Sequence, residues 1–129
     1  MTRSAAAIVG WAHTPFGKLE DPDVESLIGR VAGAALDHAG VTARDVDLVT
    51  VGVYNNGFSR QGFDAALVGT AMPDLARVPA VHLENACATG SAALNAACDF
   101  VESGRGRIAL VIGAEKMTAT PTAEVGEIL

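Results

Sequence analysis

The residue best placed to do chemistry in this sequence is Cys87, in the segment ENACATGSAAL from Glu84 to Leu94. It falls where a short predicted strand gives way to a long predicted helix. A thiol at a helix N-terminus meets the positive end of the helix dipole and unpaired backbone amides, and both favour the reactive thiolate. The small residues around it leave room beside the sulfur. The pattern predicts a nucleophile in the first turn of the helix, with most of its side chain shielded from water.

The alternative interpretation is structural, because free cysteine is among the most buried residue types and often packs as a small apolar side chain. We prefer that interpretation for Cys98, which lies in an alanine-rich stretch of the same predicted helix. On one helix Cys87 and Cys98 would lie about 16 Å apart, whereas a disulfide needs Cα atoms within roughly 7 Å. We therefore expect two free thiols. Their spacing fits no common metal site.

The elements that must position Cys87 alternate between strand and helix along the chain. Strands are predicted at Ala5 to Trp11, Asp47 to Val53, Pro79 to Leu83 and Arg107 to Ala114. Helices are predicted from a start signal at Asp21-Pro22-Asp23, with Pro22 suited to the first turn, to Gly40, and also from Phe63 to Met72 and from Ala86 to Ser103. This order indicates an α/β fold in which helices cover a mostly parallel sheet.

Two of these strands are expected near the centre of the sheet, Ala5 to Trp11 and Arg107 to Ala114. They are the longest runs without polar alternation, as is typical of strands covered on both faces. The last residues, Met117 to Leu129, show no clear period.

Composition excludes several classes of protein. The chain has 129 residues, which fits a single domain. Its formal net charge of -6, without a dense run of lysine and arginine, disfavours nucleic-acid binding. No stretch approaches the roughly 20 apolar residues that cross a bilayer, and the N-terminus lacks a signal-peptide pattern. We expect a cytoplasmic protein.

Four segments in the right order together resemble the thiolase superfamily. ENACATGSAAL resembles its nucleophile motif, and GAEKMT from Gly113 to Thr118 resembles its strand-end motif a helix and a strand later. AIVGWAHTPFGK from Ala7 to Lys18 and VDLVTVGV from Val46 to Val53 resemble its first two strands. The resemblance implies a thiolase-like layered α/β fold, with residues 1–129 as the N-terminal part of the family's N-terminal domain.

The resemblance also implies an acyltransferase, because the family's cysteine, here Cys87, is acylated by an acyl-CoA. The acyl group then passes to CoA, which completes thiolytic cleavage of a 3-ketoacyl-CoA, or to a second thioester in the reverse Claisen condensation. CoA is thus a substrate and not a permanently bound cofactor. The segment around Asn85 to Leu94 looks closer to the sterol-carrier-protein type and its bacterial and archaeal relatives than to the short-chain biosynthetic type.

The sequence departs from the family because the activating histidine and second catalytic cysteine, which come late in much longer chains, have no match. His13, His38 and His82 are interpreted as solvated or packed side chains. Cys98 lies too far along the predicted helix to replace the second cysteine. We expect this sequence to be a piece of a longer protein, inactive by itself.

Other interpretations stay open. One is a thiolase-like aldolase that cleaves a CoA-linked side chain beside a small zinc-containing partner, and another is a non-catalytic subunit with the thiolase fold. Cys87 favours acyl transfer, because only acyl transfer needs a covalent thioester. Ketoacyl synthases share the fold, but GAEKMT fits them less well.

The resemblance also implies a homo-oligomer paired through Ala80 to Leu83, an apolar strand that would otherwise be an open edge.

Overall fold

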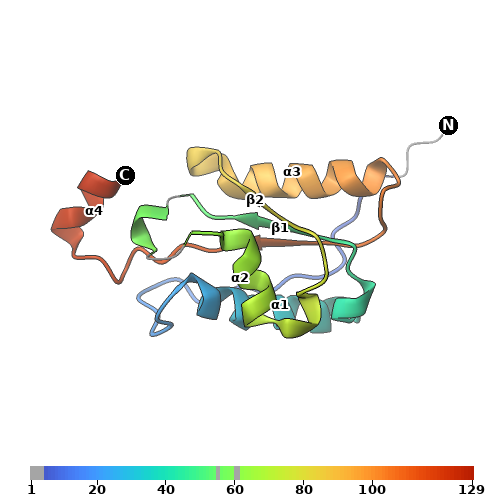
Figure 1. Cartoon of the computed structure of the whole chain (residues 1–129), viewed down its shortest axis with the longest axis horizontal. Helices are drawn as coiled ribbons and strands as arrows, with labels where there is room; N and C mark the ends of the chain where they lie inside the picture. The colour runs from blue at the N-terminus through green and yellow to red at the C-terminus, as the bar shows by residue number, and fades with distance from the viewer. Residues whose placement is uncertain (1–4, 55, 60–61) are drawn as a thin grey trace.

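The computed structural model describes residues 5–54, 56–59 and 62–129, and it shows a parallel sheet between two helical layers (Figure 1). The strands are β1 (Leu48–Gly52), β2 (Ala80–Leu83) and β3 (Ala109–Gly113), in the order β2-β1-β3. The α-helices are α1 (Val24–Ala39), α2 (Asp64–Ala71), α3 (Thr89–Glu102) and α4 (Thr122–Ile128). Short 3-10 turns are η1 (Ala43–Asp45), η2 (Asn56–Phe58), η3 (Pro73–Leu75) and η4 (Ala86–Ala88). The predicted α/β class is confirmed.

Helix α1 begins directly after the predicted start signal and ends at the predicted Gly40, but Pro22 lies before the helix and not in its first turn. The carboxylate of Asp23 accepts the backbone N–H of Ser26 at 2.8 Å and its hydroxyl at 2.6 Å. It thereby gives a partner to an amide that helix geometry leaves unpaired. At the other end, Gly40 adopts a left-handed φ of 67° and donates its N–H to the carbonyls of the last turn. Glycine has no Cβ to oppose this conformation.

Strand β1 is the centre of the sheet, and all five of its residues are buried. It pairs in parallel with β2 on one side and β3 on the other, so that Gly52 lies opposite both Leu83 and Gly113. Helices α1 and α2 cover one face and α3 covers the other (Figure 1). The Thr50 hydroxyl, on the α3 face, donates to the Ala93 carbonyl at 3.0 Å.

The predicted first strand, Ala5 to Trp11, is not a strand of this sheet. Two of its backbone amides bond to side chains instead: the Ala6 N–H donates to the Glu102 carboxylate at 3.1 Å, and the Trp11 N–H to His38 Nδ1 at 3.1 Å. Its apolar side chains are largely exposed, at 76%, 65% and 66% for Ile8, Val9 and Trp11. An apolar run indicates a tendency to be buried, but it does not specify which backbone groups pair.

The predicted position of Arg107 to Ala114 at the sheet centre is also wrong. The run contains β3, but β3 has a strand neighbour only on the β1 side within the part of the chain that the structure describes. Its burial is correspondingly incomplete, and Leu110 and Ile112 are its two buried residues.

The C-terminal region from Met117 to Leu129 contains α4, which the sequence did not predict. This helix has no buried residue, and Val125 and Ile128 are its only partly buried ones, so its short apolar face gave only a weak signal in the sequence. Across the residues described here, no helix is long and apolar enough to cross a bilayer.

Candidate active site

The candidate site lies where the three strands end. Because the strands are parallel, the residues after them meet at one edge of the sheet, which is where α/β proteins usually bind ligands. Tyr54 follows β1, Cys87 follows β2 and Glu115 follows β3. The Ala114 N–H donates to the Gly52 carbonyl at 3.1 Å and carries the β1–β3 pairing one residue past the strand.

Cys87 lies in η4, the 3-10 turn that leads directly into α3. Its position between strand and helix agrees with the sequence, but the prediction of a shielded side chain is wrong, because Cys87 is exposed. The buried face of α3 consists of Thr89, Ala93 and Ala97, spaced four residues apart. Cys87, two residues before the first of these, falls off that face. The sulfur is therefore open to an incoming ligand.

The backbone that enters this turn is strained. Ala86 has a left-handed φ of 45°, which residues other than glycine rarely adopt. The Thr89 hydroxyl spans the turn: it accepts the Asn85 N–H at 2.8 Å and donates to the Ala86 carbonyl at 2.7 Å. Among the residues that the structure describes, the Cys87 N–H has no acceptor. A free amide beside the sulfur is the kind of donor that stabilises the oxyanion of acyl transfer.

Two charged residues, to which the sequence analysis gave no role, fix the end of β3. Glu115 accepts the Tyr54 N–H at 2.8 Å. Lys116 is buried, and its ammonium donates to the Leu19 carbonyl at 2.7 Å. The GAEKMT segment therefore ties β3 to the end of β1 and to the loop before α1.

None of the three histidines forms a hydrogen bond with Cys87 in the described part of the chain. His13 is exposed and packs edge-on against Phe16, with ring centroids 4.7 Å apart. His38 accepts the Trp11 N–H. These contacts agree with the interpretation of both residues as solvated or packed.

His82 lies beside an aspartate that the sequence did not single out. Its Nε2 is 2.8 Å from the Val53 carbonyl, which only accepts, so Nε2 carries a proton. Asp64 Oδ2 lies 3.9 Å from the same nitrogen, in a side chain with no exposed surface. Neither carboxylate oxygen has a hydrogen-bond partner among the residues described. Asp64 is the first residue of α2, where the helix dipole favours negative charge.

Cys98 is half-buried within α3, and both cysteines are free, as the sequence predicted. In the described ranges, no three His, Cys, Asp or Glu side chains come together in a way that could hold a metal ion.

Comparison with known proteins assigns the family. The family model of the thiolase N-terminal domain matches residues 6–128. The chain belongs to the thiolase family. It is 38% identical over 113 residues to the acetyl-CoA acetyltransferase of Methanocaldococcus jannaschii, an alignment that covers 87% of this chain and 29% of that relative. The chain thus spans less than a third of the relative's length.

Two solved structures show the same thiolase-like fold. The acetyl-CoA acetyltransferase of Syntrophomonas wolfei superposes with a TM-score of 0.70 at 24% identity, over 81% of this chain and 27% of that one. The priming β-ketosynthase of the R1128 polyketide pathway superposes with a TM-score of 0.64 at 32% identity, over 78% and 29%.

In this thiolase chain, three of the four family-like segments meet at one edge of the sheet, where VDLVTVGV ends and the other two begin. VDLVTVGV contains β1, ENACATGSAAL forms η4 and the first half of α3, and GAEKMT follows β3. The fourth, AIVGWAHTPFGK, is the irregular N-terminal segment.

Proposed function

We propose that the protein containing this chain is a thiolase-type acyltransferase and that Cys87 is its nucleophile. In thiolysis the sulfur attacks the 3-keto carbon of a 3-ketoacyl-CoA, the bond between C2 and C3 breaks, and the C2 carbanion takes up a proton and leaves as acetyl-CoA. The acyl group, now a thioester of Cys87, then passes to the sulfur of free CoA. In condensation the sulfur attacks the thioester carbonyl of an acyl-CoA, and the CoA sulfur leaves with the proton that a base removed from the thiol. The acyl group then passes to the α-carbon of a second thioester that has lost a proton. CoA is thus a substrate of thiolysis and a product of condensation.

The observation that carries this proposal is the exposed Cys87 sulfur in a turn whose own amide has no acceptor among the described residues. The attacked carbonyl oxygen becomes negatively charged, and the Cys87 N–H is available to stabilise it. Loss of one such donor typically costs about 10²–10³-fold in kcat. Because no histidine in the described ranges bonds to Cys87, we expect the base to come from elsewhere in the full-length protein.

Acylation of the full-length protein by acetyl-CoA, followed by peptide mass spectrometry, tests the proposal. We expect one acetyl group on the peptide that contains Cys87 and none on the Cys87→Ala variant. Cys98→Ser is the matched control, because it removes the other thiol and should keep the label. A label on Cys98, or full turnover by Cys87→Ala, would contradict the assignment.

The likeness to a priming β-ketosynthase supports condensation as a second candidate reaction. The two candidates differ in the acceptor that discharges the acyl-cysteine. Rapid discharge by free CoA supports thiolysis, whereas discharge only by a thioester that supplies a carbanion supports condensation.

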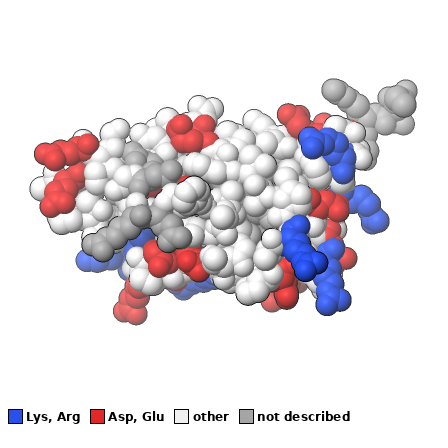
Figure 2. Space-filling model, in the orientation of Figure 1, with Lys and Arg blue, Asp and Glu red and all other residues white. Residues whose placement is uncertain are grey.

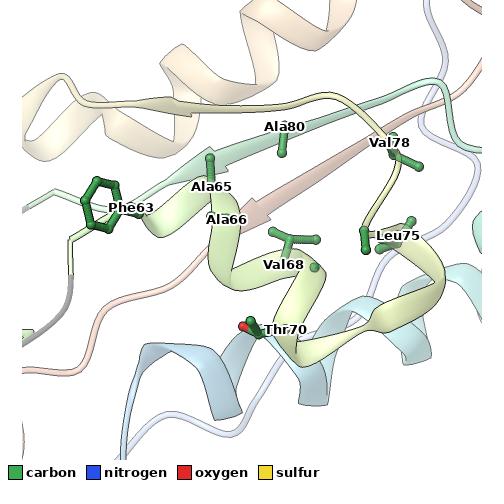
Figure 3. A pocket seen from close by; sticks show the side chains of 10 residues that line it. Phe63, Ala65, Ala66, Val68, Thr70, Leu75, Val78 and Ala80 are labelled. Carbon is green, nitrogen blue, oxygen red and sulfur yellow. The ribbon is translucent and has the colours of Figure 1, made fainter.

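We also propose that two copies of the protein pair through β2. In the described part of the sheet the outer edge of β2 has no partner, and an open edge normally requires cover. Ala80 lines a hollow of about 640 Å³ beside α2, with the exposed Phe63 at its rim (Figure 3). Val81 and Leu83 line a second hollow, of about 530 Å³, beside α3.

Both hollows are mostly apolar and flank the same strand. Figures 1 and 2 show the molecule from the same side, on which β2 lies in front of the other strands. The middle of this face carries few charged side chains (Figure 2). Strand β2, uncharged and with a hollow on either side, could pair with β2 of a second copy of the protein. A twofold axis would place the two β2 strands against each other.

A further inference from the structure

We propose that Thr89 is a positioning residue for Cys87, and that the absence of a side chain at Gly52 gives Thr89 the room to act. The inference rests on the proposed function of Cys87. Neither residue touches the substrate in this proposal. Both act by holding the turn that presents the sulfur and the free amide together.

Thr89 holds both residues that precede the nucleophile. Its hydroxyl accepts the Asn85 N–H at 2.8 Å and donates to the Ala86 carbonyl at 2.7 Å, so both of its hydrogen-bonding roles are used inside the turn. Ala86 between them has a φ of 45°. A residue in this region of φ/ψ space stays there only when its surroundings hold it. The Glu84 carboxylate accepts the Ala86 N–H, and the Thr89 hydroxyl holds the Ala86 carbonyl and the Asn85 N–H, so Thr89 is one of two side chains that maintain this backbone conformation.

Thr89 is also packed closely against the end of β1. Thr89 is only 6% exposed. A Cβ atom placed on Gly52 would lie 3.0 Å from Thr89 Cγ2 and 3.3 Å from its carbonyl oxygen. Gly52 is the last residue of the central strand, so its backbone is fixed by pairing with both β2 and β3. A side chain at position 52 would therefore be in tight contact with Thr89, which would have to shift by a few tenths of an ångström.

Two reactions of the Cys87 sulfur show whether a variant changes the orientation of the turn or only the reactivity of the thiol. Acylation by acetyl-CoA develops an oxyanion and depends on the orientation of the Cys87 N–H. Alkylation by iodoacetamide displaces iodide at a saturated carbon and develops no oxyanion. A loosened turn should therefore slow acylation and leave alkylation nearly unchanged.

The first experiment compares Thr89→Val with Thr89→Ser in the full-length protein. Valine keeps the branched shape and removes the hydroxyl, whereas serine keeps the hydroxyl. We expect Thr89→Val to lower the acylation rate of Cys87 by about 10–100-fold, the scale of a small misplacement of reacting groups. Thr89→Ser should stay within about threefold of the parent, and alkylation should change by less than about threefold in both. Equal acylation by Thr89→Val and the parent would overturn the proposal.

The second experiment does not remove the hydroxyl and so covers the case in which Thr89→Val fails to fold. Gly52→Ala should lower acylation by about tenfold, because the new methyl group displaces Thr89. Thr89→Ser lacks the Cγ2 atom that the methyl group would approach most closely but keeps the carbonyl oxygen at 3.3 Å, so the double variant should recover part of the loss and acylate faster than Gly52→Ala. If the double variant acylates no faster than Gly52→Ala, the contact between position 52 and Thr89 Cγ2 does not control the position of Thr89, and this part of the proposal is wrong.

Cys87→Ala in the same assays separates the two proposals. If it still accepts an acetyl group, the proposed function itself fails. If it does not, while Thr89→Val and Gly52→Ala acylate like the parent, Cys87 is the nucleophile and Thr89 does not position it.

Discussion

The Glu115 carboxylate accepts the Tyr54 backbone N–H at 2.8 Å, across the carboxyl ends of β3 and β1. The backbone pairing of these strands reaches only to the bond between the Ala114 N–H and the Gly52 carbonyl. A side chain thus continues the pairing beyond the last backbone bond. The edge that carries Cys87 is held partly by side chains, and these can be changed one at a time.

Glu115→Ala should lower the free energy of unfolding by about 1–3 kcal/mol, because it removes a charged acceptor from the Tyr54 N–H. Glu115→Gln should cost less, since its amide oxygen can still accept. Urea denaturation measures both. Glu127→Ala, on the exposed surface of α4, is the control and should change stability by at most about 0.5 kcal/mol. A cost for Glu115→Ala no larger than the control would show that the bond contributes nothing.

Asp47 should make stability depend on pH in the acid range. Its carboxylate accepts the backbone N–H of Arg107 at 2.7 Å and that of Ile108 at 3.2 Å. These bonds hold the pKa of Asp47 below its ordinary value. A lowered pKa in the folded state stabilises the fold above the unfolded pKa of about 4, and that contribution is lost as pH falls through the folded value.

Asp47→Asn should therefore be less stable than the parent at pH 7, and the difference should shrink as pH falls below about 4. Urea denaturation at a series of pH values measures it. A difference that stays constant from pH 7 down to about pH 3 would show that ionisation of Asp47 does not contribute.

Two glycine-to-alanine changes should shift stability in opposite directions. At Gly106 a Cβ atom would meet the Phe100 ring and lie 2.7 Å from Asp47 Cβ, so Gly106→Ala should cost about 1–3 kcal/mol. Gly33 lies inside α1 with open space around its Cβ position, so Gly33→Ala should stabilise by about 0.5–1 kcal/mol. Thermal denaturation of both, under one buffer, gives the signs directly. Shifts of the same sign would contradict one of the two local arguments.

The sequence predicted best those elements whose signals are local. The start signal Asp21-Pro22-Asp23 and the terminal Gly40 of α1, and the β-branched run of β1, are each patterns of a few neighbouring residues. The prediction was wrong where the structure depends on hydrogen bonds between residues that are far apart in the sequence. The run from Ala5 to Trp11 is as apolar as a buried strand, but its amides bond to side chains of α3 and α1.

At the site, the sequence located Cys87 but not its surroundings. Its exposure follows from the register of the buried face of α3, which starts at Thr89. The pairing of Thr89 with Gly52 joins residues from separate elements, and no short-range pattern reveals it. A threonine two residues after the cysteine and a glycine at the end of a buried strand were the available signals.

A charge on β2 should separate the proposed pair of subunits. Val81 is 48% exposed and lines the hollow on the α3 side, so Val81→Lys would place an ammonium in the interface. We expect the dissociation constant of the full-length oligomer to rise at least about tenfold, which analytical ultracentrifugation can measure. Ala34→Lys, on the exposed side of α1, is the matched control. If Val81→Lys assembles as tightly as the control, β2 is not the interface.

The last prediction concerns the 129-residue chain by itself. Iodoacetamide should modify Cys87 at least about tenfold faster than Cys98, because Cys87 is exposed and Cys98 is half-buried in α3. In urea the two rates should converge, which provides an internal control.

Acetyl-CoA, in contrast, should not acylate the isolated chain at a useful rate. In the proposed mechanism Cys87 supplies the nucleophile, and its N–H, which has no acceptor among the described residues, supplies one oxyanion donor, but no histidine in the described ranges bonds to Cys87. A positioned base typically contributes about 10²–10⁴-fold. Mass spectrometry of the chain after incubation with acetyl-CoA, beside the full-length protein, measures this contribution. Acylation of Cys87 in the isolated chain at the full-length rate would show that these residues already contain the base.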